Sequence, residues 1–491
     1  MESAKYLPIL YLILVLLSFF SILPSSFPIY SLAAIIIAII FIIAKEEKTD
    51  IKLNKYFLIL AFLLILIPKV IPYLTNSIPL GYDAGIYKYA IENPLTEEWT
   101  KSAFTPLFTL LIKFLNIILP STFILTAAVI LFELLLGFSI YLTVKEYFNK
   151  NAAILSTLLF SLSIVQFNAF TLLYFKNIIA MSFLLFSFYF LKKQKYIIFT
   201  IFSVITAGIH KPTFLLLALS FLAFTILNYK NNLKKNIISG IAIIILTLLI
   251  YIGRIKTVIL PGITEAAGLA IGPGTFITLT AYKALILIYI PFLTIGLYHL
   301  IHNKKYNILF IWFIINFIIV VFRLFFFNRY IIHLDLIILI IISIGLLEIL
   351  KDSRKIGVIT ILIIFGFLSY NVIGESLTIS PSISEIELSE IKELQETEEN
   401  AYVMATHSYY SPWVLGYSGR KTIAPGLFEY NKWDVKQWQE FWKSENVTEM
   451  LKDYERPLYI YVGTIGNINT TKFNNECFEE YVEGKLWKVK C

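Results

Sequence analysis

Long apolar runs alternate with short polar loops over most of the chain, and this pattern predicts a bundle of transmembrane helices. A bilayer core of about 30 Å needs roughly 20 apolar residues per helix, and lipid satisfies no backbone hydrogen bonds, so each run must be helical. Thirteen runs fit this description. They cover residues 6–23, 28–44, 56–73, 121–143, 152–168, 178–191, 196–209, 212–228, 236–252, 279–300, 306–322, 330–350 and 356–373. The first run lacks a small-residue cleavage site before the second begins, which favours a retained span over a removed signal peptide.

One further apolar stretch, FTPLFTLLIKFLNIIL at 104–119, is predicted to be an interfacial helix on the outer membrane surface. It has Pro106 near its start, Lys113 in its middle and Pro120 directly after it. A short helix with this pattern suits the membrane interface better than the membrane interior. The alternative is a true span, which would move every later loop to the other side of the membrane.

The distribution of Lys and Arg predicts the orientation. With the N-terminus in the cytoplasm, the predicted inner loops hold seventeen Lys and Arg, whereas the longer outer loops hold eight. Such an asymmetry orients membrane proteins with the basic loops inside. We therefore expect a multi-pass protein of the cell membrane with a cytoplasmic N-terminus. An odd number of spans places the C-terminal segment outside the cell.

The polar C-terminal segment predicts a small soluble α/β domain. AYVMATHS, KTIAPG and PLYIYVG are typical of short strands, and KWDVKQWQEFWKSE is typical of an amphipathic helix. The expected fold is an all-α polytopic bundle followed by this extracytoplasmic domain. Its parts are a membrane domain at 1–373 with a long outer loop at 74–120, a linker at 374–400, and the soluble domain at 401–491.

Two features of this domain bear on its location. Asn446 and Asn469 begin N-x-[ST] sequons, which are compatible with a position outside the cell. Cys477 and Cys491 are the two cysteines of the chain. They would pair in an oxidising compartment or stay reduced elsewhere.

Composition supports the membrane class and excludes others. Apolar residues make up 58% of the chain, charged residues 15%, and the mean hydropathy is +0.76, outside the range of soluble domains. The net charge of +8 comes from short loops and not from one basic face, so no nucleic-acid partner is expected. The sequence contains no P-loop, dinucleotide fingerprint, HExxH or Cys/His metal spacing, which argues against an ATP-driven pump.

The long outer loop PLGYDAGIYKYAIENPLTEEWTKSAF holds the strongest catalytic candidate. Loops of this length are usually functional. Asp83 lies between Gly81 and Gly85, which permit backbone turns and a close approach to a lipid-borne substrate. Tyr82 and Tyr87 are candidates for binding that substrate. A structural alternative, which does not exclude catalysis, makes Asp83 the N-cap of the helix AGIYKYAIE.

Polar and basic residues also gather at the predicted outer ends of other spans. A ring of cations at this depth suits a phosphate on a lipid carrier, because cations stabilise charge that builds on the leaving phosphate. The predicted phosphate-binding residues are His210, Lys211, Arg254, Arg323 and Arg329, and the predicted substrate-binding residues are Lys176, Asn177, Tyr330 and His333. The alternative is snorkelling to lipid headgroups, which Lys176 fits better.

Two carboxylates lie within predicted spans. Glu133 falls at mid-membrane, where an ionisable group is costly unless it is paired or faces a cavity. We expect a neutral, hydrogen-bonded Glu133 that joins two helices; a proton-coupled transporter is the alternative. Asp335 lies in the outer part of its span, where we expect it to pair with Arg329 or His333.

These motifs together resemble those of the GT-C integral-membrane glycosyltransferases, over roughly residues 56–373. The similar segments are GYDAGIYKYA around Asp83, FTPLFTLLIKF, LLYFKNIIAMSFLLFSFYFLKK, HKPTF at 210–214 and FNRYIIHLDLIILI at 327–340. The resemblance is one of topology together with these motifs, which are a few residues each.

The resemblance implies transfer of a sugar from a polyprenyl-phosphate carrier, of the dolichyl type, to a glycan, lipid or protein acceptor on the outer face. Mannosyl- and arabinosyltransferases of this kind use an Asp in the first outer loop as a base or metal ligand. Asp83 would then accept the proton of the acceptor hydroxyl in an inverting transfer, while His210, Lys211 and Arg329 stabilise the departing phosphate.

The chain departs from the family pattern in two ways. It has two additional spans before the expected first one, and its loop offers a single Asp where the family has a carboxylate pair. The need for a divalent cation, Mg²⁺ or Mn²⁺, is therefore left open, and no metal-ligating residues are predicted.

Two alternative functions are compatible with this sequence. A secondary transporter or flippase of lipid-linked sugars would need ionisable residues and broken helices near the membrane midplane. A polymerase or ligase of lipid-linked glycans would share the outer site.

Overall fold

The computed structural model describes residues 52–230, 232–255, 275–303, 306–352, 354–426, 430–466 and 468–491. The predicted spans at 6–23 and 28–44 lie outside these residues. The chain divides into two compact units. The helical unit comprises Met1–Leu74, Ile130–Phe170 and Tyr174–Ile379, and the mixed unit comprises Thr75–Val129, Thr171–Leu173 and Ser380–Cys491.

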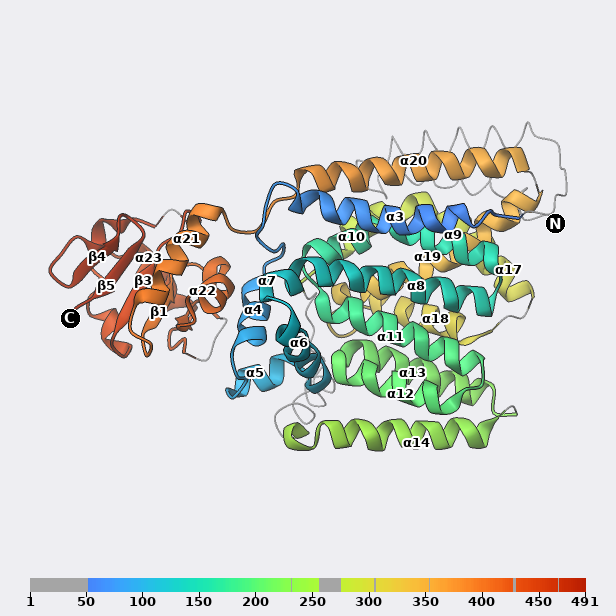
Figure 1. Cartoon of the computed structure of the whole chain (residues 1–491), viewed down its shortest axis with the longest axis horizontal. Helices are drawn as coiled ribbons and strands as arrows, with labels where there is room; N and C mark the ends of the chain where they lie inside the picture. Colours follow the sequence, from blue (N-terminus) through green and yellow to red (C-terminus); the bar gives the residue numbers. More distant parts are fainter. Residues whose placement is uncertain are drawn as a thin grey trace. The chain divides into compact units, whose positions relative to one another are not determined.

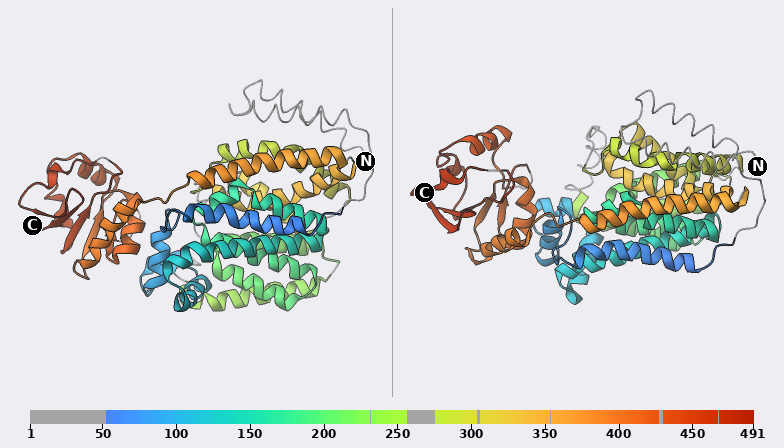
Figure 2. Two further views of the ribbon diagram at one scale, coloured as in Figure 1. Left: turned by 45° about the horizontal axis from the view of Figure 1, so that its top comes forward. Right: turned by 90° about the horizontal axis from the view of Figure 1, so that it is seen from above.

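The helical unit is a bundle of apolar helices that run side by side (Figure 1, Figure 2). Its elements in chain order are α3 (Tyr56–Val70), η2 (Ile71–Tyr73), α8 (Val129–Tyr147), α9 (Lys150–Ser161), α10 (Ile164–Thr171), α11 (Phe175–Lys192), α12 (Tyr196–Ile209), α13 (Lys211–Leu227), α14 (Leu233–Ile250), η4 (Ile252–Arg254), α16 (Leu279–Ile286), η6 (Leu287–Tyr289), α17 (Ile290–His302), α18 (Ile308–Val321), α19 (Phe327–Asp352) and α20 (Arg354–Thr378). Helix α19 forms the core, because its apolar window is completely buried by the others. A helix that is apolar on every side is typical of such a position.

The predicted polytopic bundle is confirmed. In the described part of the chain, seven helices are long and apolar enough to cross a membrane, and the bent pair α9–α10 would make an eighth span. Helices α12, α13 and α18 are apolar but shorter. Each span predicted between residues 56 and 373 coincides with one of these helices or with the bent pair.

The span predicted at 152–168 is not one continuous helix. Helices α9 and α10 meet at an angle of 52° at Leu162 and Ser163. The hydroxyl of Ser163 accepts a hydrogen bond from the backbone N–H of Gln166 (3.3 Å) and donates one to Asp335 Oδ2 (2.8 Å). Ser163 therefore acts as a helix cap inside the bundle, which explains the break.

The pairing predicted for Asp335 is wrong. Its Oδ2 accepts hydrogen bonds from Ser163 and from the side-chain amide of Gln166, each at 2.8 Å. These neutral donors lie across the helix interface and satisfy the buried carboxyl group.

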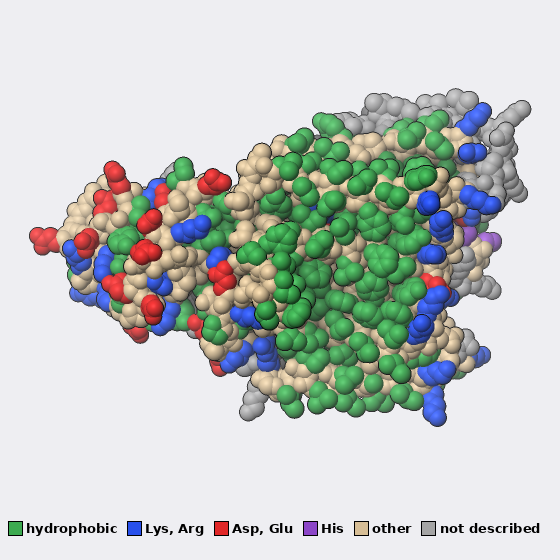
Figure 3. Space-filling model, viewed as in Figure 1, with side chains coloured by type: hydrophobic (Ala, Val, Ile, Leu, Met, Phe, Trp, Pro, Cys, Tyr) green, Lys and Arg blue, Asp and Glu red, His purple; other side chains and the backbone are tan. Residues whose placement is uncertain are grey.

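The surface of the helical unit has the composition expected of a membrane protein. Hydrophobic side chains cover the face seen in Figure 3, and Lys and Arg side chains gather at one end of the unit. Contacts at that end join the end of α8 to the end of α11, where Lys193 Nζ lies 2.7 Å from Glu146 Oε2. This end corresponds to the loops that the sequence analysis predicted to be cytoplasmic.

The mixed unit combines the long loop with the C-terminal domain. Its elements are α4 (Ala84–Glu92), α5 (Glu98–Ala103), α6 (Pro106–Ile118), α7 (Ser121–Phe123), η3 (Ile124–Ala128), α21 (Glu385–Glu393), η7 (Leu394–Glu396), β1 (Tyr402–Ala405), η8 (Ser408–Tyr410), α22 (Ser411–Ser418), β2 (Lys421–Ile423), α23 (Val435–Lys443), η9 (Met450–Asp453), β3 (Leu458–Tyr461), η10 (Thr470–Phe473), β4 (Phe478–Val482) and β5 (Leu486–Val489). The long loop at 74–120 was predicted to belong to the membrane domain. In the structure its helix α4 packs against α22 of the C-terminal domain.

The predicted small α/β domain is confirmed, with a five-stranded sheet in the order β2-β1-β3-β5-β4. Strand β1 is parallel to β2 and β3, whereas β5 is antiparallel to β3 and β4. The three predicted strands and helix α23 are all present. Strands β4 and β5 were not assigned from the sequence, because β4 exposes Glu479 and Glu480 and lacks a clear apolar alternation. Cys477 and Cys491 form a disulfide at the base of the β4–β5 hairpin.

Helix α6 has the limits expected of the interfacial helix. It starts at Pro106 with Thr105 as N-cap. Large apolar side chains are exposed along it at Leu110, Phe114, Ile117 and Ile118. Lys113 instead donates hydrogen bonds to the carbonyl groups of Ile91 (2.9 Å) and Asn93 (2.6 Å) at the end of α4.

Candidate functional site

Asp83 is the residue immediately before α4, in the mixed unit. It occupies the N-cap position, and its carbonyl oxygen accepts a hydrogen bond from the backbone N–H of Tyr87 (3.0 Å). Its side chain makes no capping hydrogen bond, and the residue is exposed. The N-cap expectation is thus met by the backbone alone, and the carboxylate is accessible to a substrate.

Gly81 shapes the turn that presents Asp83. Its φ of +89° is one that L side chains rarely adopt. A Cβ at this position would also lie 2.7 Å from the Cβ of Leu173, so the turn lies directly on the segment that joins α10 and α11. The glycine is required both for the backbone conformation and for this close approach.

Tyr82 links Asp83 to the C-terminal domain. Its hydroxyl donates a hydrogen bond to the carbonyl oxygen of Ser408 (2.8 Å), and its ring lies 6.0 Å from that of Tyr409. Burial raises the pKa of Tyr82 to about 12, and the negative charge of Asp83 adds to this effect. Tyr82 is therefore a neutral hydrogen-bond donor at physiological pH.

The segment His407–Tyr409, which was not predicted to belong to a site, lies next to Tyr82. His407 Nδ1 accepts a hydrogen bond from the backbone N–H of Tyr409 (3.1 Å), and its ring lies 6.5 Å from the ring of Tyr409. The segment directly follows β1, at the carboxyl end of a parallel strand pair. Ligands often bind at this edge of parallel sheets. The position of the segment directly after a predicted strand could therefore have marked it as a candidate site.

Two glycines hold α22 against α4. A Cβ on Gly85 would lie 1.9 Å from the carbonyl oxygen of Pro412, and a Cβ on Gly416 would lie 2.1 Å from that of Gly85. Next to this contact, Lys88 Nζ lies 4.8 Å from the centre of the Tyr417 ring. The C-terminal domain is therefore packed directly on the helix that follows Asp83.

Tyr87 was predicted to bind substrate, but its side chain packs in the interior of the mixed unit. It is buried, and its ring makes edge contacts with Phe104 at 6.0 Å and Phe108 at 5.7 Å. These three rings form an aromatic core between α4 and α6.

In the helical unit, two histidines meet across a threonine. His210 Nδ1 lies 2.8 Å from Thr213 Oγ1, which lies 3.1 Å from His333 Nε2. His210 occupies the turn between α12 and α13, Thr213 the first turn of α13, and His333 the core helix α19. Since one hydroxyl can donate only one hydrogen bond, it donates to one ring and accepts from the other.

Three cations act on His210 through their positive charges. The pKa of His210 is held well below its usual value, mainly by burial and then by the positive charges of Lys176, Arg329 and Lys211, together with His333. The structure thus brings together predicted residues from α11, α13 and α19. We call Lys176, Lys211 and Arg329, with the chain His210–Thr213–His333, the cation cluster. The neutral histidines leave its positive charge to the three long side chains.

The remaining residues predicted to bind phosphate or substrate differ in their relation to this cluster. Arg329 Nη2 donates a hydrogen bond to Thr275 Oγ1 (3.1 Å), and Tyr330 is buried with its ring 6.3 Å from that of His333. Asn177 is buried in α11. Arg254 lies in η4 beside Tyr251, and burial lowers its pKa. Arg323 is exposed in the turn before α19, and neither of these two arginines is among the charges that act on His210.

Glu133 is paired with a lysine, which the sequence analysis had not considered. Lys69 Nζ of α3 lies 3.5 Å from Glu133 Oε2 of α8, and both side chains are buried. Lys69 also lies within 5.9 Å of the ring centres of Phe160 and Phe170. The expected link between two helices is thus present, with Lys69 of α3 as the partner of Glu133.

Metal-ligating groups do not converge in the described part of the chain. No three His, Cys, Asp or Glu side chains among those residues lie close enough to hold an ion. The described side chains therefore offer no preformed site for a divalent cation.

Comparison with known proteins gives one family and one fold. Residues 89–252 match the family model described as dolichyl-phosphate-mannose-protein mannosyltransferase. The matched stretch contains Lys176, His210 and Lys211, whereas Asp83 and Arg329 lie outside it. No curated protein matches the sequence.

The solved structures that match include the oligosaccharyltransferase AglB of Archaeoglobus fulgidus. Its apo form has a TM-score of 0.62 at 12% identity, over 83% of this chain and 69% of that chain. The complex with an inhibitory peptide and a dolichol-phosphate has a TM-score of 0.58 at 14% identity, over 83% and 69%. The complex with Zn and sulfate has a TM-score of 0.53 at 13% identity, over 82% and 68%. At these identities the likeness shows a common fold.

Proposed function

We propose that this chain is a membrane glycosyltransferase of the GT-C type, and that it transfers a sugar from a polyprenyl-phosphate carrier to a hydroxyl group of an acceptor. The carrier is of the dolichyl class named in the matching family description. The acceptor is a protein, lipid or glycan on the outer side of the membrane. We further propose that the basic end of the helical unit faces the cytoplasm, following the rule for loop charge.

The observation that carries this proposal is the cation cluster. Three positive side chains from separate helices, Lys176, Arg329 and Lys211, act electrostatically on the half-buried His210. Such a cluster stabilises a phosphate group more as negative charge develops on it than in the ground state, which is the requirement for catalysis of phosphate departure. Arg329 can form paired hydrogen bonds with phosphate oxygens, whereas the lysines act as point charges.

Asp83 is proposed to act as the general base. As the acceptor oxygen attacks the anomeric carbon, Asp83 takes the proton of that hydroxyl, and the bond from the sugar to the carrier phosphate breaks. This direct displacement inverts the anomeric configuration and requires no covalent intermediate. The exposed carboxylate and the turn at Gly81 are compatible with this role.

The C-terminal domain is proposed to bind the acceptor. Tyr82, adjacent to Asp83, is hydrogen-bonded to Ser408 at 2.8 Å, and Tyr409 and His407 continue from that contact. Aromatic rings with polar edges are suited to sugars and to peptide groups alike. The packing of α22 on α4 keeps these side chains beside Asp83 in the same unit.

The test is a transfer assay in membranes that contain equal amounts of each variant, with radiolabelled polyprenyl-phosphate sugars as donors. Asp83→Asn should lower transfer by roughly 10²–10⁴-fold, the usual contribution of a general base. Glu98→Gln, which neutralises another exposed carboxylate of the same loop, should retain activity. Full activity of Asp83→Asn would remove Asp83 from the chemistry.

The phosphate role is tested separately. Arg329→Gln should lower transfer by about 10²–10³-fold, as expected when one group that stabilises transition-state charge is lost. Lys283→Gln removes an exposed cation of α16 and is the matched control. Added EDTA tests whether an external divalent cation takes part. No transfer from any donor, with lipid-linked sugar crossing vesicle membranes instead, would favour the flippase alternative, and formation of longer lipid-linked glycans would favour the polymerase.

A further inference from the structure

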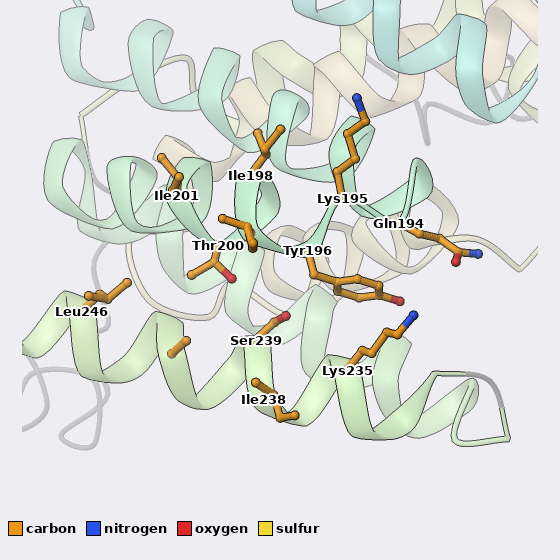
Figure 4. Close-up of a pocket in the computed structure, with 12 residues that line it drawn as sticks. Gln194, Lys195, Tyr196, Ile198, Thr200, Ile201, Lys235, Ile238, Ser239 and Leu246 are labelled. Atoms are coloured by element: carbon orange, nitrogen blue, oxygen red, sulfur yellow. The ribbon is translucent and has the colours of Figure 1, made fainter.

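An elongated groove follows the interface between α12 and α14 in the helical unit. Its volume is about 710 Å³, and its walls include Ile198 and Ile201 of α12 and Ile238 and Leu246 of α14 (Figure 4). A second hollow of about 370 Å³ shares Ile201 and Leu246 with it and continues along the same two helices. The two hollows therefore follow one another along the same helix pair, and their lining is almost entirely apolar.

Small side chains create this space. Thr200 of α12 and Ser239 and Ala242 of α14 line the groove between larger residues. Helix α14 lies at the edge of the unit, with only 17% of its apolar window buried by protein. An apolar hollow on a membrane-facing helix pair must be filled by lipid chains, since an empty space would forfeit dispersion contacts.

One end of the groove is polar and basic. Figure 4 shows the amino group of Lys235 next to the ring of Tyr196, and Lys235 Nζ lies 5.7 Å from the centre of that ring. Lys195 and Gln194 also border this end, although Lys195 points away from Lys235. Lys and Arg side chains gather at one end of the helical unit (Figure 3), and Lys234 and Lys235 in the first turn of α14 are both exposed.

We propose that this groove binds one anionic phospholipid, with its phosphate at Lys235 and the Tyr196 hydroxyl and one acyl chain between α12 and α14. The lining of the larger hollow from Lys235 to Leu246 extends over about 16 Å at the helical rise of ~1.5 Å per residue. That length matches one leaflet of a hydrocarbon core about 30 Å thick. The positive charge around the site selects a headgroup with net negative charge over a zwitterionic one. This binding site is separate from the proposed transferase chemistry.

The site is tested by native mass spectrometry of the full-length protein in detergent, titrated with palmitoyl-oleoyl phosphatidylglycerol or the corresponding phosphatidylcholine. We expect one phosphatidylglycerol to bind roughly tenfold more tightly than phosphatidylcholine, as is typical when a charge-assisted contact is added. Lys235→Gln should abolish this preference. Lys234→Gln makes the same change in charge at the neighbouring exposed lysine and should leave the preference intact.

The chain-binding part of the groove needs its own variant. Ala242→Phe fills the hollow while it retains every lysine, so it should weaken binding of both lipids by about tenfold. Ile244→Phe, at an exposed residue of α14 that does not line the groove, is its control. Gel filtration verifies that each variant remains folded and monodisperse.

Three outcomes would overturn the proposal. If Lys234→Gln reduces binding as much as Lys235→Gln, the attraction is diffuse and no specific headgroup site exists. Unchanged affinity in Ala242→Phe would place the acyl chain elsewhere. Equal affinity of wild type for the two lipids would remove the selection by charge.

Discussion

Gly85 of α4 and Gly416 of α22 approach so closely that a Cβ on Gly416 would lie 2.1 Å from the carbonyl oxygen of Gly85. Neither helix can accept a side chain at this contact without moving. The contact joins the loop that contains Asp83 to the C-terminal domain, and the hydrogen bond from Tyr82 to Ser408 lies within the same interface. The two glycines thus couple the proposed base to the proposed acceptor-binding residues.

The first prediction is that Gly416→Ala loosens this interface. Overpacking of this kind typically costs about 1–3 kcal/mol, so we expect easier proteolysis of the C-terminal domain and a raised KM for the acceptor. Limited proteolysis and acceptor titrations measure the two effects. Gly374→Ala in α20, where nothing lies within 4 Å of the added Cβ, is the control. Equal behaviour of the two variants would show that the close contact has no functional effect.

A second prediction concerns the hydroxyl between the two histidines. Thr213→Val leaves His210 Nδ1 and His333 Nε2 without their shared partner, and an unsatisfied buried polar group costs about 1–3 kcal/mol. We expect kcat for sugar transfer to fall, with little change in the amount of folded protein. Thr225→Val on the same helix is the matched control, because the buried Thr225 hydroxyl has no hydrogen-bond partner among the described residues. A normal kcat in Thr213→Val would separate the histidine pair from catalysis.

The buried ion pair of Lys69 and Glu133 supplies a third prediction. Removal of one partner leaves an uncompensated buried charge and typically costs 3–5 kcal/mol, whereas replacement of both by apolar residues is often close to neutral. Lys69→Met and Glu133→Leu should each lower the Tm in detergent, and the double variant should recover much of the loss. Thermal unfolding of the four proteins gives a double-mutant cycle. Strictly additive losses would mean that the two groups do not interact.

The fourth prediction concerns acid stability of the C-terminal domain. Burial alone would raise the pKa of Glu387, but hydrogen bonds from Tyr410 (2.6 Å), Thr464 (2.7 Å) and Ser384 outweigh it and lower the pKa to about 2. A carboxyl group with a folded-state pKa below its unfolded value of 4.5 stabilises the fold fully above pH 4.5. This contribution is lost as the pH falls from about 4.5 towards 2.

Urea unfolding of the full-length protein, followed by tryptophan fluorescence at several pH values, tests this dependence. Glu387→Gln should be less stable than wild type above pH 4.5 and should lose less stability on acidification. Glu385→Gln, at an exposed residue of the same helical turn, should retain the wild-type dependence. An unchanged pH profile in Glu387→Gln would assign the acid sensitivity to other groups.

Local patterns predicted much of the secondary structure. The apolar runs became helices, because backbone groups in lipid have no other way to form hydrogen bonds. The N-terminal proline predicted the start of α6, and the short apolar and aromatic run in PLYIYVG predicted β3. Each of these elements depends on neighbouring residues only.

Contacts between segments that are far apart in the sequence were not predicted. In the sequence, Lys69 is a lysine near the end of a predicted span, and nothing nearby in the chain indicates its partner. Glu133, its partner in the structure, lies on the separate helix α8. Tyr87 was expected to be available to a substrate, but in the structure it packs against Phe104 and Phe108. The break at Ser163 depends on Asp335, which lies on another helix.

The sequence by itself determined the class of protein, the positions of most helices and the choice of Asp83, His210, Lys211 and Arg329 as chemically interesting residues. These conclusions follow from hydrophobicity, periodicity and charge, which act along the chain. Only the tertiary structure decided which of these residues are neighbours. It put Lys176 with His210 and Arg329, left Arg254 and Arg323 out of that cluster, and added Ser408 to the surroundings of Tyr82. The physical reason is that electrostatic interactions and hydrogen bonds depend on distance in space, which helix packing sets and spacing along the chain does not.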